Sequence, residues 1–383
     1  MYDFIVIGGG IAGASIAYHL AAEAKVLLLE RESLLGYHST GRSAAVFTQA
    51  YGNGLVRRLT KASRPFFDRP PAGFTSNPLL APRGCLYIAR EDQQAVLDSE
   101  QSTNRSARAI SPAEARERVP ILRESYVAAA LFDPELYDID VNGLHQGFLD
   151  GARRAGAEIR ANTDIVSLSS MPGGWRLQTA TDAFSCKAVV NASGGWAEQL
   201  GALAGLAPIG LRPLRRSAML LDPPQHMALG AWPFVVDADE QFYFKPEAGK
   251  LLLSPADETP ATPSDVRPDE LDLAIGIDRL QQVADFPVRR IAKSWAGLRT
   301  FTADRSPVVG YDPSASGFFW LAGLGGFGIQ TAPALGREAA RLALGLGLSG
   351  DLAEFDLAAE AMAPRSERRG ALMASVLEDN GPR

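Results

Sequence analysis

The first 30 residues place a glycine-rich turn between two apolar segments of the β type. Residues 2–7 form a short β-rich run, GGGIAG follows at Gly8–Gly13, residues 11–24 have an apolar helical pattern, and residues 25–30 form a second strand. A GxGxxG motif in this βαβ context predicts a dinucleotide site. Gly8 permits the tight turn, Gly10 lets the backbone approach a pyrophosphate, and Gly13 lets the helix pack on the strand. Glu30 ends the second strand, where an acid accepts hydrogen bonds from ribose hydroxyls.

The rest of the chain predicts a second lobe inserted into this nucleotide-binding fold. A length of 383 residues is too great for one compact core. Strand patterns between about residues 210 and 303 indicate an antiparallel sheet, whereas residues 317–346 return to a buried strand followed by a helix. We expect an α/β protein with an α+β substrate lobe. Its Rossmann-type dinucleotide-binding domain would comprise residues 1–82, 139–209 and 304–383, and its antiparallel-sheet substrate domain residues 83–138 and 210–303.

Charge and composition exclude several classes of partner. The net charge of -6 argues against a nucleic-acid ligand. Cys85 and Cys186 are the only cysteines and form no CxxC motif, which fits a reducing cytoplasm. The histidines lack ligand-like spacing, so no metal site is expected. Because no apolar run reaches about 18 residues and no secretory signal precedes the first strand, we expect a cytoplasmic protein with at most peripheral membrane contact.

Two further segments favour FAD over NAD as the dinucleotide. The first, HSTGRSAA at residues 38–45, follows Glu30, where the chain would run back beneath a bound dinucleotide. The second, GLGGFGIQT at residues 323–331, joins a buried strand to a helix. Its bare backbone could lie against a flavin ring, and the start of the helix would stabilise negative charge at flavin N1/O2 on reduction. Together with the first motif, they predict a large buried cofactor.

At this point the sequence resembles a known family. The motifs IGGGIAGAS, LLLERE, YHSTGRSAA, VVNASGGWA, WAGLRTFTAD and GLGGFGIQT resemble those of the D-amino-acid oxidase/glycine oxidase/sarcosine oxidase family, with the greatest likeness to bacterial D-arginine dehydrogenase. The resemblance runs through nearly the whole chain and implies FAD, two interleaved domains and oxidation of an amine at carbon. Because nothing in the sequence clearly marks a covalent flavin link, we expect the FAD to be bound non-covalently. The cofactor-binding residues expected from the motifs and the resemblance are Gly8, Gly10, Ile11, Ala12, Gly13, Glu30, Arg31, Ser39, Thr40, Arg42, Ser43, Ala44, Val166, Ala192, Gly194, Trp196, Gly323, Gly325, Gly326, Gly328, Ile329, Gln330 and Thr331.

The resemblance also implies a site for a substrate carboxylate. Arg299 matches the carboxylate anchor of the family, and a guanidinium suits this role because it binds a carboxylate through two charge-assisted hydrogen bonds. Tyr243 matches a tyrosine that shares the carboxylate, Tyr51 an active-site tyrosine on a mobile loop, and Arg216 a residue near the substrate. The alternative roles are a solvated arginine on a strand for Arg299 and Arg216, and an interfacial aromatic residue for each tyrosine.

Two departures from the family pattern concern the substrate side chain. Cys85 stands where the arginine-preferring relatives carry a carboxylate, and Val46 where they carry a histidine. With Gly326 and Gln330, these residues complete the expected substrate pocket. A buried cationic tail without an anion is strongly disfavoured, so the pocket should prefer uncharged side chains. An acid near Tyr243, such as Glu240 or Asp239, could replace the missing carboxylate.

The predicted reaction is FAD-dependent oxidative deamination of a D-amino acid with a neutral or apolar side chain. Hydride would pass from the substrate Cα to flavin N5, and the imino acid would hydrolyse to a 2-oxo acid and ammonia. The partners would be this small substrate and an electron acceptor, either a quinone or oxygen; no side chain is a compelling general base. Two alternatives stay open: oxidation of a 2-hydroxy acid or of a secondary amine of the glycine or sarcosine type, and a flavin-containing electron-transfer or assembly subunit with a vestigial pocket.

Overall fold

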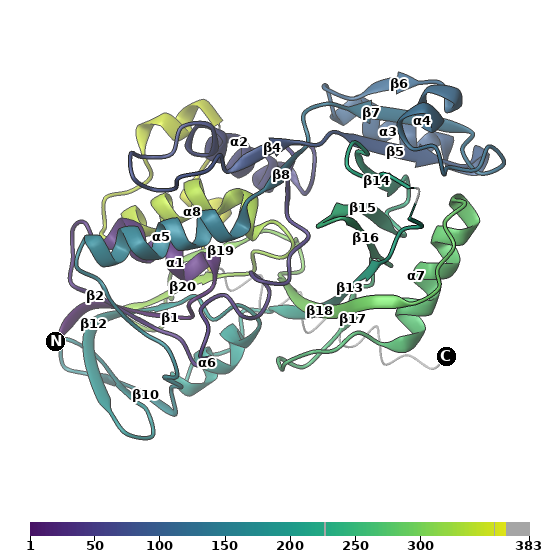
Figure 1. The fold of residues 1–383 in the computed structure, drawn as a ribbon. Coiled ribbons are helices and arrows are strands. Elements are labelled where there is room, and N and C mark those ends of the chain that lie inside the picture. The colour runs from purple at the N-terminus through teal and green to yellow at the C-terminus, as the bar shows by residue number, and fades with distance from the viewer. Residues whose placement is uncertain (226, 356, 365–383) are drawn as a thin grey trace, which may run out of the picture.

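The computed structural model describes residues 1–225, 227–355 and 357–364 of the chain. Two lobes, each built on one large sheet, lie side by side, and a small sheet joins them (Figure 1). The α-helices are α1 (Ile11–Leu20), α2 (Gly54–Asp68), α3 (Gln94–Thr103), α4 (Pro112–Arg118), α5 (Val141–Arg154), α6 (Ala197–Leu203), α7 (Glu270–Val283) and α8 (Gly328–Ala343).

The first lobe contains an eight-stranded sheet. Its strands are β1 (Tyr2–Ile7), β2 (Val26–Leu29), β9 (Glu158–Arg160), β10 (Ser167–Met171), β11 (Gly174–Gln178), β12 (Ala183–Asn191), β19 (Val308–Tyr311) and β20 (Phe318–Ala322). β1 lies between β2 and β12 and runs parallel to both. Alternate residues of β1 enter two cores: Phe4 and Val6 pack against α1, α5 and α8, whereas Ile5 and Ile7 pack on the opposite face. Burial on both faces explains why β1 is continuously apolar.

The second lobe contains a nine-stranded sheet. Its strands are β5 (Cys85–Ala89), β6 (Arg108–Ile110), β7 (Ala129–Asp133), β13 (Arg212–Leu221), β14 (Phe234–Asp237), β15 (Tyr243–Glu247), β16 (Lys250–Ser254), β17 (Thr259–Pro260) and β18 (Ile291–Phe301). The sheet is antiparallel as expected, except that β5 and β14 are parallel. Along β15 the faces alternate: Phe244 joins one apolar core, whereas Tyr243 joins a smaller cluster with Cys85.

A three-stranded sheet lies at the junction of the lobes. It consists of β3 (Val46–Phe47), β4 (Leu80–Pro82) and β8 (Tyr137–Ile139), in the order β3-β8-β4. The backbone N–H groups of Arg83 and Gly84 donate to the carbonyl of Leu136 at 3.1 and 2.9 Å, which ties the two connections between the lobes together. These strands have only two or three residues each and carry no periodic pattern, so the sequence did not predict them.

The strand–helix–strand unit expected in residues 2–30 and the strand and helix expected in residues 317–346 are present as β1, α1, β2, β20 and α8. Asn53 caps α2 by accepting from the Val56 N–H at 3.0 Å, and Asp140 caps α5 by accepting from the Gly143 N–H at 2.8 Å. The α/β fold class with a sheet-rich substrate lobe is confirmed. The domain boundaries stay a prediction, and residues 365–383 of the expected FAD-binding domain lie outside the described residues.

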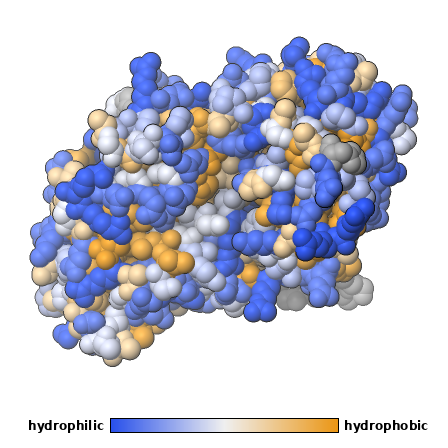
Figure 2. Space-filling model, viewed as in Figure 1, coloured by the Kyte–Doolittle hydropathy of each residue, from blue (hydrophilic) through white to orange (hydrophobic). Residues whose placement is uncertain are grey.

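Within the described parts of the chain, none of the helices is long and apolar enough to cross a membrane. Hydrophilic residues cover most of the face seen in Figure 2, and hydrophobic areas are interspersed among them.

Candidate functional site

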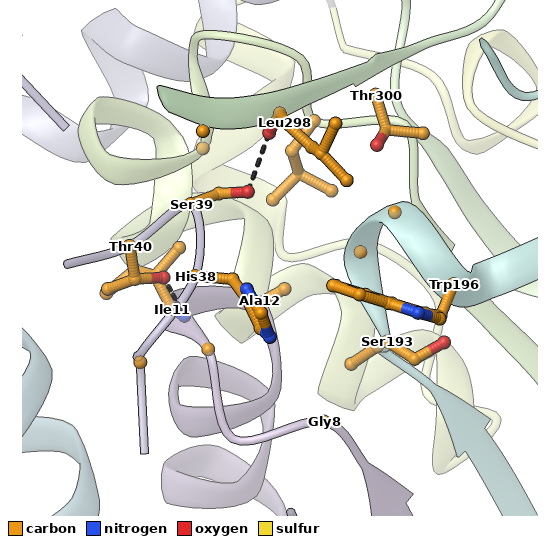
Figure 3. A pocket seen from close by; sticks show the side chains of 18 of the residues that line it. Gly8, Ile11, Ala12, His38, Ser39, Thr40, Ser193, Trp196, Leu298 and Thr300 are labelled. Carbon is orange, nitrogen blue, oxygen red and sulfur yellow. Dashed lines mark hydrogen bonds between the residues drawn. The ribbon is translucent and has the colours of Figure 1, made fainter. Parts of the chain in front are cut away.

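A cavity of about 360 Å³ lies where the first turn of the nucleotide fold meets the second lobe. Its walls come from the β1–α1 turn, residues 36–44, residues 192–196, β18 and the glycine-rich segment before α8 (Figure 3). The volume falls within the range of small-molecule and cofactor sites, roughly 300–1,000 Å³. The structure therefore brings segments from most of the chain's length to one site.

The β1–α1 turn has the geometry that the motif predicts. Gly8 has φ of +110°, and a Cβ there would lie 2.4 Å from the carbonyl oxygen of Ala192, so only glycine fits. Gly10, Ile11 and Ala12 line the cavity, which places the positive end of the α1 dipole there. Gly13 does not line it. A Cβ at Gly13 would lie 1.8 Å from the Gly8 carbonyl oxygen, so this glycine permits close packing of helix on turn.

Glu30 lines the cavity and also holds the turn. Its carboxylate accepts from the backbone N–H of Gly9 at 2.7 Å and from that of Glu32 at 2.9 Å. A carboxylate offers about four lone-pair positions, so acceptor capacity remains for ribose hydroxyls. On the other side of the turn, the ring of His145 hydrogen-bonds to the Gly9 carbonyl at 2.8 Å. Glu30 is therefore a structural residue of the turn as well as a candidate ligand residue.

Residues 36–44 form a loop that contacts both lobes. Ser39 donates to the carbonyl of Leu298 at 2.6 Å, and Thr40 accepts from the Ile11 N–H at 3.0 Å (Figure 3). Across the cavity, the rings of His38 and Trp196 lie 4.6 Å apart between centroids (Figure 3). The loop thus joins the start of α1 to β18 on one wall of the cavity.

The glycine-rich segment before α8 forms another wall. Gly325 has φ of +54°, and a Cβ there would meet the ring of Phe301 at 2.1 Å; a Cβ at Gly326 would lie 2.9 Å from Nη1 of Arg299. Gln330, on the first turn of α8, accepts from the Thr48 N–H at 3.2 Å. Its Nε2 is buried and has no hydrogen-bond partner within the described residues. An unsatisfied buried donor of this kind is costly.

These observations fit FAD. A glycine turn at a helix N-terminus suits the pyrophosphate, Glu30 suits a ribose, and the backbone of residues 323–326 lines the cavity, where a flat ring can approach it. The expected cofactor residues that line the cavity are Gly8, Gly10, Ile11, Ala12, Glu30, Arg31, Ser39, Thr40, Arg42, Ser43, Ala44, Ala192, Gly194, Trp196, Gly323, Gly325, Gly326, Gly328 and Ile329.

Three of the four expected catalytic residues line the same cavity. Arg299 comes from β18, Tyr243 from β15 and Arg216 from β13. Burial would raise the pKa of Tyr243, but the charges of Arg299 and Arg216, with hydrogen bonds from Ser254 and Arg216, outweigh it and lower that pKa. Within the described ranges, no carboxylate lies in ion-pair contact with Arg299.

Several expected site residues lie outside the lining. Tyr51 packs against Phe327 with ring centroids 5.0 Å apart, close enough to Arg299 for a hydrogen bond between their side chains. Val46 and Cys85 belong to the apolar cluster around Tyr243, and Cys85 is only 1% exposed. Burial raises the pKa of the Cys85 thiol well above its usual range. Four expected cofactor residues also lie outside the lining. Gly13, Gln330 and Thr331 pack near the starts of helices α1 and α8, and Val166 is exposed.

The acids that the sequence offered near Tyr243 lie at a hairpin tip. Glu240, with φ of +54°, is exposed between β14 and β15, and Asp239 accepts a hydrogen bond from Gln93 at 2.8 Å. Neither forms an ion pair with Arg216 or Arg299 among the contacts of the described chain. No group of three or more His, Cys, Asp or Glu residues within the part of the chain that the structure describes could hold a metal ion.

Sequence reasoning missed part of the cavity wall. Ser193, Gly195 and Leu298 lie inside motifs already recognised, so neighbouring positions in VVNASGGWA and WAGLRTFTAD signalled them. Residues 163–165 and 199–203 carry no such signal. Residue 163 reaches the cavity because its backbone N–H donates to the carbonyl of Glu30 at 2.8 Å. Contacts of this kind depend on the three-dimensional arrangement alone.

The comparisons with known proteins agree with an FAD site in this cavity. A family model described as "FAD dependent oxidoreductase" (DAO) matches residues 3–342. Glycine oxidase of Geobacillus kaustophilus (strain HTA426) is 26% identical over 375 residues, which cover 93% of this chain and 96% of that protein. A crystal structure of glycine oxidase from the same species superposes with a TM-score of 0.79 at 25% identity, over 92% of this chain and 97% of that one. L-proline dehydrogenase from P. horikoshii has the same fold, with a TM-score of 0.81 at 24% identity over 96% and 98% of the two chains.

Proposed function

This chain belongs to the DAO family of FAD-dependent oxidoreductases, and from this premise we propose that it oxidises the carbon–nitrogen bond of an amino acid whose carboxylate binds Arg299. FAD is its cofactor. The similarity to glycine oxidase, across nearly the full length of both chains, supports the general activity, which is oxidation of an amino acid or amine. The expected closeness to D-arginine dehydrogenase stays a prediction.

One observation carries the proposal: the enclosed guanidinium of Arg299 has no carboxylate partner among the described residues. Burial would lower the pKa of Arg299, but its interactions with the phenols of Tyr243 and Tyr51, together with the more distant charge of Glu258, raise it. An enclosed cation that faces a cavity without an anion favours an anionic ligand. A carboxylate matches the planar guanidinium through two hydrogen bonds, and a phenol can donate a third.

The chain's own residues would bind and orient the reactants. Arg299 and Tyr243 would hold the carboxylate, and Gly326 leaves room for the guanidinium to lie against the backbone. The turn at Gly8–Ala12 would hold the pyrophosphate, and Glu30 a ribose. Bound FAD supplies the two-electron acceptor for hydride from the substrate carbon. The imino acid then hydrolyses to a 2-oxo acid and ammonia, and a quinone or oxygen would reoxidise the cofactor.

The finer proposal is a D-amino acid with a neutral side chain. Cys85 and Val46 form an uncharged cluster with Tyr243, and neither offers an anion to a cationic tail. Burying a cation without a partner costs far more than burying an apolar group. An apolar side chain would gain roughly 25 cal/mol per Å² of surface that it buries against such a cluster.

A second candidate is glycine or an N-substituted glycine. The observation that favours it is the burial of Cys85 at 1% exposure: this residue and Val46 pack into the cluster and do not line the cavity. Space for a large side chain beyond Tyr243 would then require the cluster to open. A substrate without a side chain needs no such rearrangement.

Anaerobic mixing with a panel of small substrates tests the proposal. The purified protein is expected to be yellow, to release FAD on denaturation and to bleach with one class among D-amino acids, glycine, sarcosine and 2-hydroxy acids. Bleaching by D-Leu or D-Met supports the first candidate, and bleaching by glycine or sarcosine alone supports the second. A flavoprotein that bleaches only with 2-hydroxy acids, or with no member of the panel, would refute amino-acid oxidation.

A further inference from the structure

The cavity contains a second guanidinium, that of Arg216, whose surroundings differ from those of Arg299. Arg216 donates through Nε to the backbone carbonyl of Asp257 at 2.8 Å and through Nη2 to Oε1 of Glu258 at 3.0 Å. Its side chain is 10% exposed, and it lines the same cavity as Tyr243. The Asp257 carbonyl and the Glu258 carboxylate thus hold Arg216, which also hydrogen-bonds with the phenol of Tyr243.

Glu258 serves two arginines at once. Besides Arg216, it accepts from Arg305, whose Nη1 lies 3.0 Å from Oε2 and whose Nη2 lies 2.6 Å from Oε1. Burial would raise the pKa of Glu258, but Arg305, Arg216 and Arg299 outweigh it and lower that pKa, so the group is a carboxylate at neutral pH. Arg305 is itself half-exposed and lies over the ring of Phe301.

The result is an asymmetry between two cations that both lower the pKa of the same phenol, Tyr243. Arg216 has an ion-pair partner in Glu258, whereas no described carboxylate makes such a contact with Arg299. Glu240 interacts with both guanidinium groups only at longer range, from its exposed position at the hairpin tip. Glu258 also attracts Arg299 at longer range, so within the described residues the cavity presents one guanidinium with an ion-pair contact and one without.

We propose that Glu258 determines substrate specificity by neutralising and holding Arg216, so that the site accepts a substrate with one carboxylate. Without the Glu258 charge, Arg216 becomes a second anion-binding group, and the site gains affinity for amino acids with an acidic side chain. A specificity device of this type acts by keeping a competing ligand out as much as by binding the right one. The inference rests on the proposed function in one respect, the role of Arg299 as carboxylate anchor.

Glu258→Gln tests this, because the amide has the same shape and no charge. The matched control is Asp222→Asn: Asp222 has the same 31% side-chain exposure and also pairs with two cations, Lys250 and Arg290, away from the cavity. Each holoenzyme is mixed anaerobically with D-Glu and D-Gln, which differ only in the charge of the side chain. Succinate and propionate, titrated against the flavin spectrum, report binding without turnover.

The Glu258→Gln variant is expected to shift the D-Glu to D-Gln ratio of kcat/KM, or the succinate to propionate ratio of affinity, at least about tenfold toward the dianion, because one charge-assisted contact is worth at least this factor. The Asp222→Asn variant should keep the ratio of the unmodified enzyme, and Glu258→Asp should restore much of it. An unchanged ratio in Glu258→Gln, or a preference for the dianion already in the unmodified enzyme, overturns the inference and leaves the proposed function intact. If no carboxylate perturbs the flavin spectrum and no amine bleaches it, the proposed function fails, and the role of Glu258 fails with it.

Discussion

Replacement of Arg299 by alanine removes the group on which the proposed function depends most. The side chain lines the cavity, lies within hydrogen-bonding reach of Tyr51 and lies against Gly326, so its loss leaves a space without a cation. Arg216 cannot take over while Glu258 and the Asp257 carbonyl hold it. Loss of one desolvated contact to a carboxylate costs on the order of 2–5 kcal/mol. At 1.36 kcal/mol per factor of ten, kcat/KM should fall by about 30- to 5,000-fold.

The assay is anaerobic reduction of the bound flavin by the best substrate of the panel, with FAD content measured in parallel. FAD should remain bound, because the cofactor turn at Gly8–Ala12 lies on the other lobe. Arg290→Ala is the control: this arginine precedes β18, is 77% exposed and pairs with Asp222, so its loss should leave kinetics unchanged. If Arg299→Ala keeps normal kcat/KM with FAD bound, Arg299 is not the anchor and the carboxylate argument is wrong.

Four further predictions concern the cofactor, the side-chain site and pH. Glu30→Ala should weaken FAD retention, measured by ultrafiltration, with little effect on substrate preference; because the Gly9 and Glu32 N–H groups lose their acceptor, it should also lower the unfolding free energy of the apoprotein by about 1–3 kcal/mol per group. Unaltered FAD affinity would contradict the ribose assignment. Cys85→Glu should move kcat/KM from D-Leu toward D-Arg and lower Tm, because it buries a carboxyl group in an apolar cluster; a clear preference for D-Arg in the unmodified enzyme would contradict the neutral side-chain pocket. Because the pKa of Tyr243 is lowered, its phenol should ionise at a pH below the usual range for tyrosine. The phenolate repels the substrate carboxylate, so KM should increase as the pH rises through that range. Tyr243→Phe should remove this increase. Burial lowers the pKa of His19 from 6.5 to about 4. The folded protein should therefore have its full stability above pH 6.5 and lose roughly 3 kcal/mol of unfolding free energy as the pH falls toward 4. His19→Leu should reduce this loss, measured by urea titration.

The sequence by itself determined the cofactor half of this protein. The signals for the cofactor site are local: GGGIAG, Glu30 and the segments 38–45 and 323–331. A few adjacent residues are enough to specify a glycine at φ of +110° or a helix that starts beside a turn. The βαβ unit of residues 2–30 and the strand and helix of residues 317–346 followed from apolar patterning, and most of the expected cofactor residues line one cavity. Short strands such as β3 and β8 were not predicted, because two or three residues are too few to show an alternating pattern of apolar and polar side chains.

Only the tertiary structure decided the state of each charge and the packing around the substrate site. Arg216 and Arg299 look alike in the sequence, yet only one acquires an acid partner, because Glu258, some 40 residues away, comes back beside β13. Cys85 and Val46 were expected in an open pocket and instead pack together around Tyr243, because three strands from different parts of the chain bring them into one cluster. Charge compensation and close packing depend on distances between remote segments, and no local pattern encodes those distances.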